Sequence, residues 1–554
     1  MRNASDLFRP KSKRSRGRTL LLTAGFLAAY GVVGGRLVTL GLDEAPAYAL
    51  SASASRSIAA ARPDIRDRNG QLLATDIKTA SLYAEPRSVI DVDEATAALV
   101  EALPELDYDT VRSRLDTNKG FVWLKRELTP HQQQIVHRLG VPGIGFLREN
   151  RRIYPNGHAA AHVLGHVNVD NEGLAGIERY IDSVGLEDLH AFGFARDAEQ
   201  SPVDLSIDLR VQHAMAEELS EALSTFSAKA ASGVVLDIRT GEIVAMASLP
   251  DYDPNNPVGA LEKDNLNRMT TGVFEMGSVF KTFTSAMALD AGLVRPETMI
   301  DARGKLRIGR HSIGDYHGEN RMLTVEEVFT YSSNVGTGRM ALMAGPDYQQ
   351  AFLKKLGLLD RLRTEVPESG APIVPPRWPE ITTATVSFGH GLSVTPLQTA
   401  AAAASLLNGG VYLTPTFLKR AAGEATGRRV VSEQTSRDII RLMKANAERG
   451  SGRKAAEIAQ GYRLGGKTGT SEKAINGRYV DDRLFTSFLS TFPLDAPRYV
   501  VLVSLDEPQA TKDTYGYATA GWNAAPTVGR IVARIAPMLG IAPSADKALK
   551  VVRN

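Results

Sequence analysis

Ser278 and Lys281 are residues whose types and spacing could do covalent chemistry. They stand three positions apart in FEMGSVFKTF, residues 274–283, and a helix-like pattern follows as far as Gly292. Positions i and i+3 lie on one face of a helix, so the Lys281 amine could take the proton of the Ser278 hydroxyl. A helix N-terminus also favours an alkoxide on the serine. The pair predicts a serine nucleophile with a lysine base, although a serine that only begins a helix has the same pattern.

Two other Ser-x-x-Lys pairs occur in the chain. They are Ser451–Lys454 in GSGRK and Ser544–Lys547 in SADK. Ordinary composition gives roughly two such pairs by chance in a chain of this length. Ser451 stands in a glycine-flanked polar stretch, and no large apolar run follows Ser544. We therefore predict that these two are loop or cap serines.

Two further motifs follow Ser278 in order. YSSNVGT contains Ser332, Ser333 and Asn334, and RLGGKTGTSEKA contains the Lys467-Thr468-Gly469-Thr470 tetrad. Each is weak alone, because a lone Lys-Thr-Gly is usually a turn and a lone Ser-x-Asn is usually a helix cap. Ser-x-x-Lys, Ser-x-Asn and Lys-Thr-Gly in this order are typical of β-lactamases and penicillin-binding proteins. The order therefore favours Ser278 as a nucleophile.

Composition and charge exclude some classes of function. The 554 residues suffice for more than one domain, and 43% hydrophobic with 23% charged residues is typical of a folded protein. The net charge is +3, but residues 1–18 carry +6, so the rest of the chain carries −3. A slightly acidic bulk has no electrostatic basis for binding nucleic acid, and we expect none. The chain has no cysteine, which suits an oxidising compartment.

An apolar segment, TLLLTAGFLAAYGVVGGRLVTLGL, follows the basic tail at residues 19–42. About 20 apolar residues span a bilayer, and basic residues on the N-terminal side keep that side cytoplasmic. The segment predicts a single membrane anchor with the bulk of the chain outside the inner membrane. A cleaved signal peptide is the alternative, because APAYALSASA offers small residues at a cleavage spacing.

The elements that must position the three motifs are strands from both ends of one domain. Gly233–Ser248 predicts a β-hairpin, and Phe485–Phe492 and Tyr499–Leu505 predict a second pair of strands. The chain between these hairpins is mainly helical in pattern. Strands, then helices, then strands again indicate one antiparallel sheet with helices packed on it.

The whole pattern resembles the class B penicillin-binding proteins, and within them the division-specific peptidoglycan D,D-transpeptidases. RPDIRDRNGQLLATD resembles their membrane-proximal motif, and RENRRIYPNGHAAAHVLGHVNVDNEGLAGIERYID resembles their non-catalytic module. GVVLDIRTGEIVAMASLPDYDPNNP resembles the opening of their transpeptidase domain, and SFGHGLSVTPLQTA resembles its core helix. Met276 departs from the family's usual proline. Ser333 replaces the aspartate of β-lactamases, which favours a synthase over a hydrolase.

The resemblance implies an α+β fold with a single N-terminal transmembrane helix. An α+β pedestal, which we call the non-catalytic module, follows at residues 62–200. The catalytic domain at residues 201–540 has a five-stranded antiparallel sheet flanked by helices. The remaining segments are a cytoplasmic tail at 1–18, the anchor at 19–42, a stalk at 43–61 and a C-terminal tail at 541–554.

The chemistry that these residues can do agrees with the resemblance. Ser278 would attack the penultimate carbonyl of a D-Ala–D-Ala bond. Lys281, held neutral by burial and by the cationic Lys467, would take the hydroxyl proton. Ser332 would relay a proton to the leaving amine, and Asn334 would orient Lys281 and the substrate amide. Whether Lys281 or another group is the base stays open, because the acylation base of related enzymes is disputed.

The resemblance also implies how the substrate is bound. Thr468 and Thr470 would bind the terminal carboxylate, and the strand with Gly469 would run along the substrate. The backbone N–H groups of Ser278 and Thr470 would form the oxyanion hole. We expect no cofactor. The His158, His162 and His166 spacing could hold a metal on one helix, but Gly165 argues against a regular helix there, so we expect no metal.

Two rival functions remain open at this point. The same motifs suit a D,D-carboxypeptidase or β-lactamase, in which water accepts the acyl group, and a non-catalytic division scaffold or β-lactam sensor. The module and the anchor favour a synthase of the bacterial inner membrane, with its catalytic domain periplasmic and serving the division septum; a role at the side wall stays open. Stem peptides and β-lactams are the expected ligands. The expected partners are a polytopic division glycosyltransferase, since no such domain is visible here, and other divisome membrane proteins.

Overall fold

The computed structural model describes residues 23–34, 61–192, 201–421, 423–475 and 478–544. It divides into two compact units, residues 1–59 and 60–554, each considered by itself. In the first unit residues 23–34 form a helix, and the rest of the predicted anchor lies outside the described residues. Within the described ranges no helix is both long and apolar enough to cross a membrane. The transmembrane helix therefore stays a prediction.

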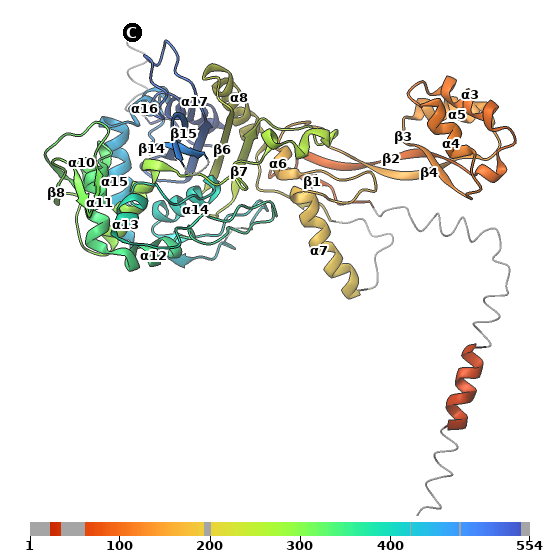
Figure 1. The fold of residues 1–554 in the computed structure, drawn as a ribbon, viewed down its shortest axis with the longest axis horizontal. Helices are drawn as coiled ribbons and strands as arrows, with labels where there is room; N and C mark the ends of the chain where they lie inside the picture. The colour runs from red at the N-terminus through yellow and green to blue at the C-terminus, as the bar shows by residue number, and fades with distance from the viewer. Residues whose placement is uncertain (1–22, 35–60, 193–200, 422, 476–477, 545–554) are drawn as a thin grey trace, which may run out of the picture. The chain divides into compact units, whose positions relative to one another are not determined.

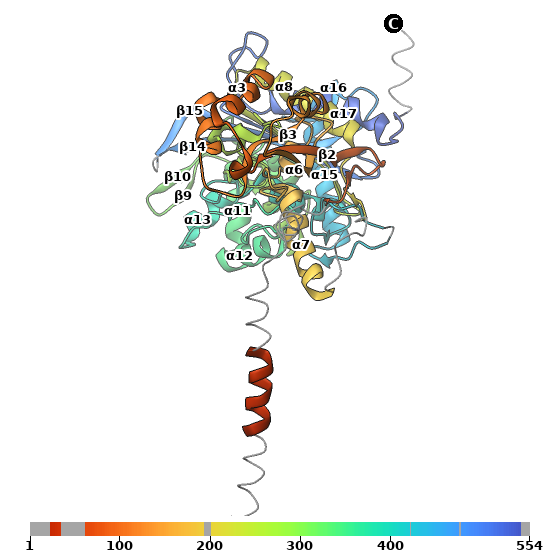
Figure 2. The same ribbon diagram turned by 90° about the vertical axis from the view of Figure 1, so that its right-hand side faces the viewer.

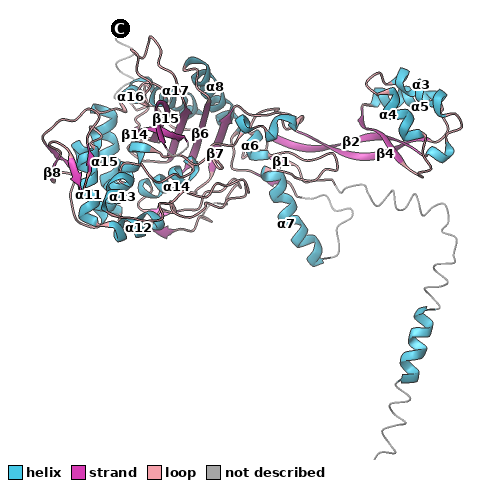
Figure 3. Cartoon of the chain, viewed as in Figure 1, coloured by secondary structure: helices cyan, strands magenta, loops and turns pink. Residues whose placement is uncertain are grey.

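The non-catalytic module is built on a long pair of antiparallel strands, β2 (Leu72–Ala84) and β4 (Ile144–Ile153). Figure 3 shows helices gathered at one end of this pair, where they bury a small apolar core of their own with β3. The other elements of the module are β1 (Ile65–Arg66), β3 (Val122–Leu128), α3 (Val92–Ala102), α4 (Tyr108–Leu115), α5 (Pro130–Leu139), α6 (Ala161–Leu164) and α7 (Gly176–Phe192). β5 (Val203–Asp204), just beyond the predicted boundary, pairs with β1 and joins the same sheet.

A buried ion network holds the opposite end of the module together. The Arg152 guanidinium, fully buried, donates to Glu178 at 2.7 Å and to Asp76 at 3.1 Å. Arg62 donates to the second oxygen of Glu178 at 2.8 Å. Buried charges are tolerated only when paired and hydrogen-bonded, and here the Glu178 carboxylate is held by two guanidinium groups. The network fastens the start of the module to β2, β4 and α7.

The catalytic domain contains the predicted antiparallel sheet, with strand order β14-β15-β16-β6-β7. The two hairpin predictions and the prediction that one sheet is built from both ends of the domain are confirmed. Its strands are β6 (Ala230–Asp237), β7 (Ile243–Leu249), β14 (Gly465–Ile475), β15 (Arg478–Phe492) and β16 (Tyr499–Asp506).

Both faces of this sheet are covered, which explains why β16 is apolar at nearly every position. Val501 and Val503 point into a core with α8 (Leu209–Thr225) and α17 (Ala524–Met538). Val500 and Leu502, on the opposite face because side chains alternate along a strand, pack in the larger core of the central helices. α8 and α17 lie side by side in both ribbon views (Figures 1 and 2).

The central helices lie on the other face of the sheet and carry the first two motifs. They are α9 (Lys281–Asp290), α10 (Val325–Thr330), α11 (Asn334–Ala344), α12 (Pro346–Lys355), α13 (Glu380–Val386), α14 (Pro396–Leu407) and α15 (Glu433–Arg449). α16 (Arg453–Ile458) packs against α17 instead. Short strands connect them: β8 (Met299–Asp301), β9 (Leu306–Ile308), β10 (His311–Ile313), β11 (Met322–Thr324), β12 (Val411–Tyr412) and β13 (Arg428–Arg429). α14 is buried along its whole length, as its alanine-rich sequence allows.

Candidate active site

Ser278 lies in a 3-10 turn, Gly277–Phe280, that leads directly into α9. The sequence pattern predicts a helix from Ser278 onward, whereas the α-helix begins at Lys281. Gly277 explains the tighter start, because its φ of +54° lies in the left-handed region that precedes the turn. In a 3-10 turn positions i and i+3 are eclipsed, so Ser278 and Lys281 still share a face.

Two glycines let the turn lie directly against the Lys-Thr-Gly strand. A Cβ atom on Gly277 would stand 2.6 Å from the Thr470 carbonyl oxygen. A Cβ atom on Gly469 would stand 2.3 Å from the Met276 carbonyl oxygen. Both distances are too short for any side chain, so the absence of side chains brings the nucleophile's turn and β14 into backbone contact.

The Ser332 hydroxyl lies between the two motif lysines. Lys281 Nζ donates to Ser332 Oγ at 3.0 Å and also to the Ser332 carbonyl. Lys467 Nζ donates to the same Oγ at 3.0 Å and to the Thr468 carbonyl at 3.3 Å. Ser332 has a φ of +59°, a conformation that non-glycine residues seldom adopt. Three motifs far apart in the sequence therefore meet at one oxygen atom.

Burial governs the protonation of both lysines. Lys281 is 1% exposed and Lys467 is fully buried. Burial lowers the pKa of Lys281 well below its ordinary value, and the charge of Lys467 lowers it further, while Asp315 opposes the shift. Burial alone lowers the pKa of Lys467 to about 7. An amine that is neutral near pH 7 can accept a proton, which an ordinary lysine cannot.

The middle of the second motif is a helix cap bound to an unpredicted carboxylate. Ser333 caps α11 by accepting from the Gly336 N–H at 2.9 Å, and it donates to Asp315 Oδ2 at 2.7 Å. The other Asp315 oxygen accepts from the Val335 N–H at 3.0 Å. The Asn334 amide donates to the Gly314 carbonyl at 3.2 Å. The Lys281 amine donates to Ser332, whereas the Asn334 amide donates to Gly314.

The third motif forms part of β14, as predicted, and its threonines reach a second loop. Thr468 Oγ1 lies 2.5 Å from Ser451 Oγ, and Thr470 Oγ1 accepts from the Ala520 N–H at 3.1 Å. A cavity of about 260 Å³ opens beside the two threonines. It is lined by Gly450, Ser451, Arg453, Lys454, Thr468, Thr470, Thr519, Gly521 and Trp522.

Comparison with known proteins identifies the family. The penicillin-binding protein dimerisation domain matches residues 57–186, and the penicillin-binding protein transpeptidase domain matches residues 231–532. The chain belongs to the penicillin-binding protein transpeptidases. The resemblance drawn from the sequence is thereby confirmed.

The relatives of this penicillin-binding protein share most of its length. It is 42% identical over 499 residues to the probable peptidoglycan D,D-transpeptidase FtsI of Caulobacter vibrioides. The matched region covers 88% of this chain and 83% of the relative. It is 33% identical over 515 residues to the peptidoglycan D,D-transpeptidase FtsI of Escherichia coli K12, at 88% and 86% coverage.

Two solved structures of penicillin-binding proteins resemble this chain. Penicillin-binding protein 3 of Mycobacterium tuberculosis, complexed with aztreonam, is 26% identical with a TM-score of 0.68 and covers 88% of this chain and 98% of that one. The transpeptidase domain of Burkholderia pseudomallei penicillin-binding protein 3 is 32% identical with a TM-score of 0.55, covering 61% and 97%.

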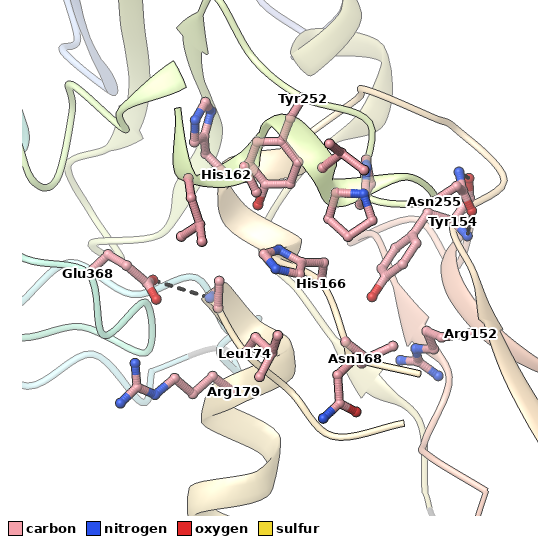
Figure 4. Close-up of a pocket in the computed structure, with 18 of the residues that line it drawn as sticks. Arg152, Tyr154, His162, His166, Asn168, Leu174, Arg179, Tyr252, Asn255 and Glu368 are labelled. Carbon is pink, nitrogen blue, oxygen red and sulfur yellow. Dashed lines mark hydrogen bonds between the residues drawn. The ribbon is translucent and has the colours of Figure 1, made fainter. Parts of the chain in front are cut away.

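A larger cavity, of about 1000 Å³, lies between the non-catalytic module and the loop after β7, and none of the three motifs lines it (Figure 4). His162 lies there and bonds the Asn265 carbonyl at 2.7 Å, while His166 packs its ring edge against Tyr252. α6 ends at Gly165, whose φ is +74°, as the sequence predicts. Within the described ranges no three histidine, cysteine or acidic side chains cluster as a metal site.

Sequence reasoning missed two residues that contact the predicted motifs, Asp315 and Ser451. Asp315 carries no motif, and no signal in its own neighbourhood marks it. Ser451 does lie in a loop, as predicted, but its contact with Thr468 joins segments 17 residues apart. The one signal that could have found it is its position shortly before the Lys-Thr-Gly strand in a glycine-rich stretch.

Proposed function

We propose that this penicillin-binding protein is a serine D,D-transpeptidase that cross-links peptidoglycan stem peptides in septal wall synthesis and is acylated by β-lactams. The observation that carries the proposal is the Ser332 hydroxyl, which lies 3.0 Å from the amines of both Lys281 and Lys467. It connects the base that follows Ser278 to the strand that would hold the substrate. The printed names of the relatives support the same reaction.

Acylation begins with attack of Ser278 Oγ on the carbonyl carbon of the penultimate D-alanine. The Ser278 proton passes to the neutral Lys281 amine, the C–O bond forms, and the C–N bond of the terminal D-alanine breaks. The leaving amine takes a proton through Ser332 Oγ, which Lys281 then replenishes. The hydrogen bonds at Ser332 support this relay, because one hydroxyl can accept from a lysine while donating to the leaving nitrogen.

Stabilisation of the tetrahedral intermediate is assigned to the backbone N–H groups of Ser278 and Thr470. Two such donors aimed at a developing oxyanion contribute about 10²- to 10³-fold each to the rate. The backbone contact between the Gly277 turn and β14 supports this assignment, since it places the two chain segments side by side. Thr468 and Thr470, on the same strand as Gly469, would then hold the terminal carboxylate of the stem peptide.

In the second half-reaction the amine of a neighbouring stem peptide attacks the ester carbonyl. The amine loses a proton to Lys281, the new amide C–N bond forms, and the ester C–O bond to Ser278 breaks. Lys281 then returns the proton to Ser278 Oγ, which restores the hydroxyl and the neutral amine. Asn334, half-buried at the start of α11, would orient the substrate amide. Ser333 at the position of the β-lactamase aspartate supports transfer to an amine rather than to water.

We further assign the protein to the inner membrane, with residues 19–42 uncleaved and the catalytic domain in the periplasm at the septum. The basic tail and the length of the apolar segment support this topology. A polytopic glycosyltransferase would supply the glycan strands. N-terminal sequencing of the mature protein tests the anchor, because a new N-terminus at residues 51–54 would mark a cleaved signal peptide.

Labelling with fluorescent penicillin tests the nucleophile. The purified full-length protein in detergent is labelled, digested and mapped by mass spectrometry. We expect the adduct on Ser278, complete loss of label in Ser278→Ala, and retained label in Ser451→Ala. An adduct on Ser451 or Ser544, or undiminished labelling of Ser278→Ala, contradicts the assignment.

A further inference from the structure

The second Ser-x-x-Lys pair of the chain, Ser451 and Lys454, lies at the substrate strand rather than in a remote loop. Ser451 Oγ is 2.5 Å from Thr468 Oγ1, and both residues line the cavity of about 260 Å³ beside Thr470. Lys454 lines the same cavity. The first motif therefore has a counterpart across β14, with a hydroxyl and an amine of its own.

The loop that carries Ser451 is fixed to β14. Asn446, fully buried at the end of α15, accepts from the Ser451 N–H at 3.2 Å and from its hydroxyl at 3.3 Å. The same Asn446 side chain donates to the Gly466 carbonyl at 2.7 Å. The Asn446 amide thus joins the loop to β14 and holds Ser451 in place beside Thr468.

Lys454 is held over an aromatic face instead of in an ion pair. Its Nζ lies 3.2 Å from the centroid of the Trp522 ring, which stacks on Tyr517 and meets Tyr515 edge-on. In the described part of the chain Lys454 makes no ion pair, because the nearby Glu457 pairs with Arg453 at 3.3 Å. A cation over a tryptophan ring keeps its capacity to bind an anion.

The other cations near the cavity are already paired. Arg453, which also lines the cavity, pairs with Glu457 at 3.3 Å. Lys467 is turned to Ser332 and the Thr468 carbonyl. Lys473, further along β14, is bound by Asp506 and Glu507 at 2.7 Å each. Hydroxyl groups alone bind a carboxylate weakly compared with a charged donor. A carboxylate laid on Thr468 and Thr470 therefore finds its countercharge in Lys454.

We propose that Ser451 and Lys454 complete the subsite for the donor's terminal carboxylate, with Ser451 fixing the Thr468 hydroxyl and Lys454 supplying the positive charge. The inference rests on the proposed transpeptidase function and deepens it. Lys454 is the specificity determinant: it makes the enzyme select substrates and β-lactams with an anionic group at this position over neutral ones.

The test compares two probes on the full-length protein: benzylpenicillin and its carboxamide, in which the carboxylate is replaced by a neutral amide. The second-order rate constant of Ser278 acylation is measured for each. A charge-assisted hydrogen bond at a half-buried site is worth about tenfold or more. Lys454→Met should lose about tenfold or more with benzylpenicillin and change by less than twofold with the carboxamide.

Three variants serve as controls. Arg463→Met removes a cation that pairs with Asp495 at 2.8 Å and does not line the cavity, and should leave the ratio of the two rate constants unchanged. Lys454→Arg, which keeps the positive charge, should retain most of the preference for benzylpenicillin that Lys454→Met loses. Ser451→Ala should reduce the benzylpenicillin rate about threefold, since it removes one hydroxyl partner of Thr468.

If Lys454→Met lowers the rate constants of both probes equally, Lys454 has a structural role and the proposal is overturned. The proposal is also overturned if neither rate constant changes. These outcomes differ from failure of the proposed function. If the wild-type protein is not acylated at Ser278 by either probe, the transpeptidase assignment fails; if it is acylated and Lys454→Met keeps the preference, only the subsite fails.

Discussion

Replacing Gly277 by alanine puts a methyl group where the fold leaves no space for one. The new Cβ would stand 2.6 Å from the Thr470 carbonyl oxygen, so the turn and β14 must separate by roughly 0.6–0.8 Å to reach an ordinary contact. The left-handed φ of +54° adds a backbone cost of about 1–2 kcal/mol. Because both proposed oxyanion donors flank this contact, the displacement falls on the catalytic geometry.

A displacement of this size is expected to slow acylation strongly. Catalytic groups must be held within about 0.5 Å, and a 1 Å misplacement costs on the order of 100-fold. We therefore expect Gly277→Ala to reduce the second-order rate constant of acylation by fluorescent penicillin by about 30- to 100-fold. Stopped-flow fluorescence measures this rate constant. The midpoint of thermal unfolding, Tm, should fall by only a few degrees, since a loss of about 1–2 kcal/mol is a small part of the stability of a chain this long.

Gly292 supplies a matched control. It has a φ of +68°, just after α9, but a Cβ atom there would meet nothing within 4 Å. Gly292→Ala should carry the same backbone cost and keep acylation within about twofold of wild type. Acylation of Gly277→Ala within threefold of wild type, or equal losses in both variants, would refute the argument that backbone contact positions the oxyanion hole.

Three further outcomes are expected. Ser332→Ala removes the hydroxyl shared by the two lysines and should slow acylation by about 10²-fold or more, measured with the same probe; a loss under fivefold contradicts the relay. Because the pKa of Lys467 is depressed to about 7, the unfolded chain binds more protons between pH 7 and about 10.5. The free energy of unfolding should therefore rise with pH through this window in the wild-type protein and rise less in Lys467→Met. Denaturant unfolding at pH 7 and 9 measures this rise, and an equal rise in both proteins contradicts the lowered pKa of Lys467. Arg152→Ala leaves Glu178 and Asp76 buried beside one fewer cation and should cost about 3–5 kcal/mol, while Arg66→Ala, in an exposed pair, should cost under about 1 kcal/mol; similar costs contradict the network's role.

The parts of the site that the sequence predicts are those that lie close together in the chain. Ser278 and Lys281 share one turn, and Lys467 to Thr470 share one strand, so local pattern suffices to find them. The sheet could be predicted as well, because its buried strands are long apolar runs bounded by turns. Covalent spacing and side-chain period carry this information directly.

The parts that the sequence does not predict depend on tertiary contact. Asp315 reaches Ser333 from a loop 18 residues away. Ser451 contacts Thr468 directly, from a loop that the Asn446 side chain joins to Gly466. The 3-10 start of the nucleophile's helix follows from the contact of Gly277 with β14, which no local propensity contains. Helix pattern alone therefore places the α-helix three residues too early.

The most direct test of the central claim is the product made by the full-length protein with its polymerase partner, lipid-linked precursor and a D-amino-acid acceptor. The glycan is digested and the muropeptides are separated. The account predicts cross-linked dimers and exchange of the terminal D-alanine, both absent in Ser278→Ala. Tetrapeptides without cross-links as the main product would contradict transfer to an amine and establish a hydrolase instead.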